Sequence, residues 1–305
     1  MRKTDPERGY GMKKTGIILL AVILLAAAFL PDTVRAEDAE TLKPYSGETG
    51  YTYVTFGRYP QTITGGSPDD PANTARWRKE YRDWETAKRK ELKLKKHDPL
   101  DPYDPGPIEK EPILWRVMST DGESIYLMSE YILFASPMHM DLKEYSKLGD
   151  AFEQTDLGRK LNGEFAKAAF TDTEMEALLP FGTMGKICVP SYKDLNNADM
   201  GLTKKKLKTR KAMATEYAIR STGAFVYSAR DGSHTPYWLR EHAESVANQA
   251  RSTKKDGSAG RLGAHNQDVG ARPVIQLAAD RFRITGGNGT KEDPYTLEAT
   301  GNNSP

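Results

Sequence analysis

The sequence predicts an α+β fold: one domain of short mixed or antiparallel strands, with two central helices and long loops. Three observations predict it. Strand-like runs lie towards both ends of residues 37–298, helical segments lie between them, and polar or glycine-rich stretches separate the elements. A parallel α/β fold is disfavoured because strands and helices are grouped instead of alternating.

The first strands are predicted by alternating aromatic, β-branched and polar residues. Residues 51–57 form one such run, and Pro60 ends it because proline cannot donate to a strand ladder. Residues 113–118 and 125–129 flank an Asp-Gly turn, which predicts a hairpin. The alternation places three side chains on one face of that hairpin: Ile113, Trp115 and Val117.

A charged helical insertion is predicted at about residues 65–112. Its helix covers residues 75–96, where Trp77, Tyr81 and Trp84 recur at helical spacing and form one aromatic stripe. The stripe either docks on the parent domain or binds a partner protein. The second interpretation gains from a basic end of the helix, made of Lys88, Arg89, Lys90, Lys93, Lys95 and Lys96.

The middle of the chain is predicted to be helical. Residues 156–169 carry apolar side chains at helical spacing, and a capping box at Thr171–Glu174 starts a second helix that runs to about residue 179. A short buried strand is expected at residues 187–189. The basic run at residues 204–211 is interpreted as a solvated helix face, with an anion-binding patch as the alternative.

The last third returns to strands and loops. Strands are expected at residues 224–228, 237–240 and 269–277, and a long loop at residues 251–268. Residues 282–297 suggest a closing hairpin-like unit. Residues 299–305 are expected to form a disordered tail.

The N-terminus has the order of a secretory signal peptide. Lys13 and Lys14 precede the apolar run of residues 16–30, and Val34-Arg35-Ala36 has the small residues of a cleavage site. The run is shorter than a comfortable membrane span, so an uncleaved anchor is the alternative. We therefore expect a secreted or cell-surface protein, cleaved near Ala36.

Composition restricts the partners. Removing residues 1–36 takes away six basic and three acidic side chains, which leaves 38 Lys and Arg against 39 Asp and Glu. A near-neutral chain gives no reason to expect nucleic acid as a partner, nor a membrane after signal cleavage. The single cysteine, Cys188, lies in an apolar stretch and is expected to be a buried structural thiol.

Familiar catalytic patterns are missing from the sequence. The histidines are scattered and form no metal-binding motif, and neither a nucleophile elbow nor a phosphate-binding glycine loop occurs. Residues 196–201 match a calcium loop only incompletely, so no cofactor is predicted and calcium stays open. A hydrolase would have to use loop carboxylates, such as Asp231, Glu241 or Asp268.

A candidate ligand-binding site is formed by Tyr237, Trp238, Arg240 and Arg272, at the ends of predicted strands. Aromatic rings beside a guanidinium offer a platform for a sugar, because ring faces give apolar contact and arginine gives fixed donors. The alternative is structural: Trp238 belongs to the core and the arginines brace loops through carboxylates.

The order of several short blocks resembles a bacterial family of unknown function, the one numbered 6273, over roughly residues 51–280. The blocks are residues 54–61, 112–117, 125–133, 161–165, 169–172, 214–218, 238–240 and 269–273. The resemblance implies an exported or surface-associated protein. The 65–112 insertion departs from the usual spacing of the family's first two blocks.

Residues 238–240 and 270–273 also resemble C-type-lectin-like folds, which include the formylglycine-generating enzymes. Those enzymes need a cysteine pair, and only Cys188 is present. We therefore expect a non-enzymatic exported module that binds an extracellular glycan or protein through the loops around residues 237–240 and 251–272. The alternatives are the carboxylate hydrolase and a protein-interaction scaffold that docks through the 75–96 helix.

Overall fold

The computed structural model describes residues 38, 40–95, 98, 100–205, 207–243 and 246–301. The predicted signal peptide lies outside these residues, and so does Lys96 of the basic helix end. The fold is mixed α+β, with helix and strand in nearly equal shares, as predicted. Within the described residues, no helix is both long and apolar enough to cross a membrane.

The main sheet contains eight strands in the described part of the chain and follows the order β12-β13-β1-β2-β3-β11-β5, with β6 also paired to β11. Its pairs are antiparallel except for β1 and β13. The strands are β1 (Tyr53–Pro60), β2 (Lys110–Thr120), β3 (Ser124–Ser129), β5 (Leu178–Leu179), β6 (Ile187–Cys188), β11 (Val274–Ala278), β12 (Phe282–Gly286) and β13 (Tyr295–Ala299).

Two smaller sheets complete the described β structure. One pairs β4 (Phe134–Ala135) with β10 (Gly270–Ala271). The other joins β7 (Trp238–His242), β8 (Gln249–Thr253) and β9 (Ala259–Gly263).

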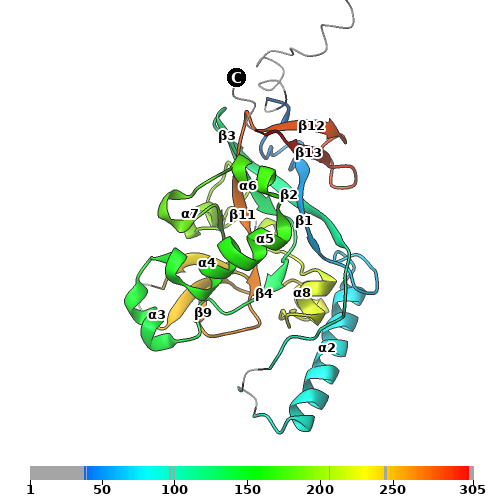
Figure 1. The fold of residues 1–305 in the computed structure, drawn as a ribbon, viewed down its shortest axis with the longest axis vertical. Helices are drawn as coiled ribbons and strands as arrows, with labels where there is room; N and C mark the ends of the chain where they lie inside the picture. Colours follow the sequence, from blue (N-terminus) through cyan, green and yellow to red (C-terminus); the bar gives the residue numbers. More distant parts are fainter. Residues whose placement is uncertain are drawn as a thin grey trace, which may run out of the picture.

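The longest helix, α2 (Pro71–Glu91), projects from the body of the molecule (Figure 1). The others are short: α3 (Leu142–Leu148), α4 (Asp156–Lys160), α5 (Ala166–Ala169), α6 (Asp172–Ala177), α7 (Tyr192–Leu195) and α8 (Glu216–Arg220). A π-helical turn, Leu161–Phe165, joins α4 to α5.

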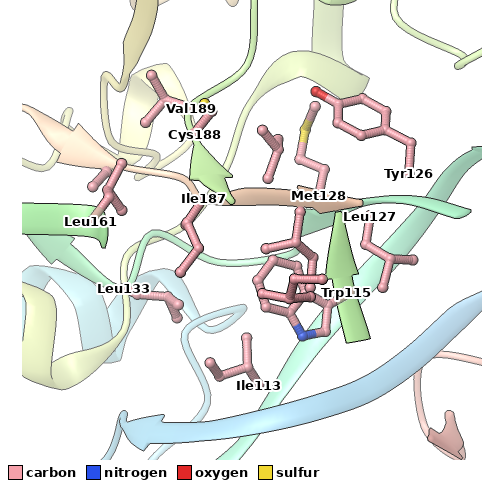
Figure 2. Packing of buried hydrophobic residues seen from close by; sticks show 14 of the residues in the cluster. Ile113, Trp115, Tyr126, Leu127, Met128, Leu133, Leu161, Ile187, Cys188 and Val189 are labelled. Carbon is pink, nitrogen blue, oxygen red and sulfur yellow. The ribbon is translucent and has the colours of Figure 1, made fainter. Parts of the chain in front are cut away.

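Several predicted elements are confirmed. The β2–β3 hairpin forms, α4 to α5 run through residues 156–169, the capping box precedes α6, and β12 pairs with β13. Cys188 is fully buried, and burial raises the pKa of its thiol to about 12. Figure 2 shows it beside Ile187 and Val189, and it belongs to the same core cluster as Trp115.

Other predictions are wrong. Residues 251–268 are not a long loop, because β8 and β9 form a hairpin there that β7 extends. Residues 224–228 have no regular secondary structure and join no described ladder, and Phe225 instead donates its backbone N–H to the carbonyl of Asp268. Ala299 belongs to β13 and not to a disordered tail, because it pairs with Phe282.

Candidate functional site

The aromatic platform predicted at the strand ends is not exposed. Tyr237, Trp238 and Arg272 each have 0% of their surface accessible. The Tyr237 hydroxyl donates to the carbonyl of Arg210, and the guanidinium of Arg272 lies over the Tyr237 ring at 5.3 Å. A sugar cannot stack on rings that other protein atoms already cover, so the prediction of a platform on these three residues is corrected to a structural role.

Arg240 lies apart from that buried group and is half-buried. Its guanidinium is 3.7 Å from the carboxylate of Asp194 and lies over the ring of Phe181 at 5.7 Å. This arginine therefore braces α7 against β7, which is the structural alternative that the sequence left open.

The aromatic stripe of α2 is used within the molecule. Trp77 is fully buried, and Tyr81 packs so closely on Gly223 that an added Cβ at that glycine would lie 2.4 Å from its hydroxyl. Trp84 meets the ring of Tyr103 edge to face at 5.4 Å. Trp77 and Tyr81 dock the insertion on the parent domain, whereas Trp84 packs on Tyr103 within the insertion itself. The three aromatic side chains therefore do not form a free partner-binding stripe.

The carboxylates considered for a hydrolase do not converge. Asp231 accepts from the hydroxyl of Ser228, and Glu241 accepts from the backbone N–H of Tyr192. Asp268 lines a cleft to which the other two do not contribute. The predicted trio therefore does not form one site.

That cleft lies between α2 and the parent domain and has a volume of about 740 Å³. Sequence reasoning did not identify it, although its loop residues fall within the 251–272 segment. Its lining comes from α2, from the segment of the insertion that holds Asp98, Leu100 and Pro102, and from residues 135–140 and 265–268. Lys160, Thr222 and Gly223 complete it. A hollow of this size is typical of small-ligand sites.

The α2 wall is held in place by a buried carboxylate. Glu216 of α8 accepts the backbone N–H groups of Ile63, Thr64 and Gly65, just before the insertion begins. Burial opposes ionisation, but these hydrogen bonds and that of Arg220 keep the pKa of Glu216 below its usual value. The entrance to the insertion is therefore fixed to α8.

Arg78 connects the α2 wall to the opposite side. Its guanidinium donates to the carbonyl of Gly223 at 3.0 Å and lies 5.5 Å from the rings of both Tyr81 and Phe225. Asp268 lines the same part of the cleft. Burial, aided by the charge of Glu85 and opposed by Arg78, raises the pKa of the Asp268 carboxyl.

The remaining lining divides into a polar and an apolar part. The polar part includes His265, Asn266 and Gln267, and both His265 and Gln267 are exposed. The apolar part contains Leu100, Pro102, Pro137 and Met140, and Met140 is 46% exposed. The cleft can therefore offer a ligand both directional hydrogen bonds and apolar contact.

The incomplete calcium loop uses its amides internally. Asn196 donates to the carbonyl of Tyr192 and accepts from Arg210, while the side chain of Asn197 accepts from the backbone of Asp199. Among the described residues, no group of three or more His, Cys, Asp or Glu side chains is placed to hold a metal ion.

Three comparisons with known proteins were made. No family model, curated protein or solved structure matches this chain.

Proposed function

We propose that this protein is an exported, non-enzymatic module that binds an extracellular glycan in the cleft beside α2. The cleft's lining carries the proposal. Planar polar side chains, including Arg78, Asn266, Gln267 and Asp268, line the same cleft as apolar side chains such as Leu100, Pro137 and Met140. Sugars present hydroxyl groups that both donate and accept, together with apolar C–H surfaces, so they match a lining of this mixed kind.

The same proposal takes the fold to be C-type-lectin-like and the chain to be related to family 6273. In support, residues 270–273 lead directly into β11, a strand within the main sheet, and Tyr237 forms a parallel bridge to Gly270. The two sequence blocks that carry the resemblance are therefore neighbours in space.

The test measures retention of the purified chain on insoluble cell-wall sacculi and on immobilised neutral polysaccharides. The His265→Ala/Gln267→Ala variant removes two exposed lining side chains, and Lys204→Ala/Lys205→Ala is a control at exposed positions outside the cleft. Two lost hydrogen bonds weaken binding by about tenfold. A chelator arm decides whether calcium contributes.

Binding by the control with loss in the cleft variant supports the proposal. Equal retention of both variants would show that the ligand does not bind in the cleft. If no polymer retains the chain while a defined extracellular protein does, and the cleft variant loses that protein, the ligand is a protein instead of a glycan.

A hydrolase is the second candidate, because Glu85 and Asp268 line the same cleft. A carboxyl group with a raised pKa keeps its proton to higher pH, as the acid in glycoside hydrolysis must, and the second carboxylate would activate water. The measurement is release of reducing ends from each polymer. Turnover that Asp268→Asn abolishes, while folding and binding persist, would replace the binding module with an enzyme.

A further inference from the structure

A second hollow adjoins the cleft and has no lining residue from α2. It has a volume of about 460 Å³ and is lined by Ser136, Asp156, Arg159, Lys160, Gly163, Glu164 and Lys167. Ser136 and Lys160 line both hollows, so the two meet at these residues. The second hollow, here called the groove, lies over α4, the π-helical turn and α5.

The junction between cleft and groove is rigidly supported. The buried indole of Trp238 donates to the carbonyl of Ser136 at 2.7 Å. The ammonium group of Lys160 lies 5.4 Å from the centre of the Phe134 ring, which is itself fully buried. The passage between the two hollows is therefore built on core side chains.

Two glycines of the same helical run differ in what they accommodate. At Gly158 an added Cβ would lie 2.1 Å from the carbonyl oxygen of Phe152, so packing requires a glycine there. At Gly163 an added Cβ would meet nothing within 4 Å, although glycine weakens a helix. Packing does not require a glycine at position 163, but a groove that must stay open does, because a larger side chain there would fill it. Gly163 also lies in a π-helical turn, a feature frequent at functional sites.

The charges along the two hollows balance. Their combined lining holds five cationic side chains, Arg78, Arg89, Arg159, Lys160 and Lys167. It also holds five anionic side chains, Glu85, Asp98, Asp156, Glu164 and Asp268. A polyanion gains little from such a surface, whereas an uncharged chain with many hydroxyl groups finds donors and acceptors along its length.

We propose that the ligand is a linear, uncharged oligosaccharide that enters the cleft and continues past Ser136 and Lys160 into the groove over Gly163. This inference rests on the proposed glycan-binding function. It adds that the site spans several sugar units, so that affinity rises with chain length.

The test is calorimetric titration with oligomers of N-acetylglucosamine and of glucose, each with two, four and six sugar units. The Gly163→Leu variant fills the groove with a side chain that clashes with nothing at its Cβ. Gly47→Leu is the matched control, because Gly47 is exposed, also has open space and lies outside both hollows. Dextran sulfate serves as the polyanion.

The expected result is a hexamer that binds at least about tenfold more tightly than the dimer, one step of the affinity scale. Gly163→Leu should lose this gain and keep the affinity for the dimer, while Gly47→Leu keeps both. Equal affinity for dimer and hexamer would overturn the inference and leave the proposed function standing. Tightest binding of dextran sulfate would overturn the uncharged ligand, and no binding of any saccharide would overturn both proposals.

Discussion

Two charged regions of this molecule differ in how their charged side chains are paired and exposed. Arg116 and Glu130 are buried and paired with each other, and Glu130 also forms an ion pair with Lys291 at 3.1 Å. Lys291 reaches Asp69 as well, at 2.7 Å. In the cleft beside α2, by contrast, Asp268 and its neighbours line a hollow open to solvent.

The difference separates structural charges from charges available to a ligand. Burial opposes ionisation of Glu130, yet Arg116 and Lys291 lower its pKa to about 2. The network links the loop before β13 to the end of β3 and to the start of the insertion. Partners within the protein neutralise the Glu130 carboxylate, whereas polar side chains of the cleft face solvent, where a ligand can reach them.

Removing Glu130 should therefore cost the most stability. Glu130→Ala leaves Arg116 and Lys291 without their shared counter-ion, and breaking a buried pair in this way destabilises by about 3–5 kcal/mol. Urea unfolding followed by circular dichroism measures the loss. Asp268→Asn is the control from the cleft and should change the free energy of unfolding by less than about 1 kcal/mol. Similar losses for both variants would contradict the distinction.

A buried histidine gives the next largest effect. His234 is 1% exposed, and burial, aided by the charge of Lys211, lowers its pKa from 6.5 to about 4. Between these two values the unfolded chain binds a proton that the folded chain excludes. The free energy of unfolding should therefore decrease as the pH is lowered, by about 2 kcal/mol between pH 7 and pH 4.5.

The comparison for this prediction is His234→Asn, measured by urea unfolding at several pH values. The variant should lose less stability than the wild type across the same window, whatever its stability at pH 7. Parallel curves for the two proteins would show that His234 does not titrate as its burial implies.

Local sequence patterns were sufficient to predict most of the strands and helices of the fold. Alternation around Trp115 predicted the β2–β3 hairpin, because the buried face of a strand needs a period of two. The β8–β9 hairpin was missed because residues 251–268 are rich in Gly, Ser, Lys and Asp. Its first strand, β8, is stabilised by pairing with β7, a contact that local composition does not reveal.

The candidate site was harder to predict, because it depends on which side chains the tertiary structure covers. Tyr237 and Trp238 have the composition of a sugar platform, but the packing of β7 against the core buries both. The cleft needs α2 and residues 265–268 side by side, and these are far apart in the sequence. The stripe on α2 was a usable signal, since its docking brings Arg78 and Glu85 to the cleft.

The smallest effect is expected for Gly163→Ala in the groove, with Gly158 of the same helical run as its comparison. Gly163→Ala should stabilise the protein by about 0.5–1 kcal/mol, because alanine favours a helix and its methyl group meets open space. Gly158→Ala should destabilise it by about 1–3 kcal/mol, because its Cβ would clash with a backbone carbonyl. Thermal unfolding of both variants measures the two signs. A loss of stability in Gly163→Ala would give that glycine a structural role and remove one argument for the groove as a ligand site.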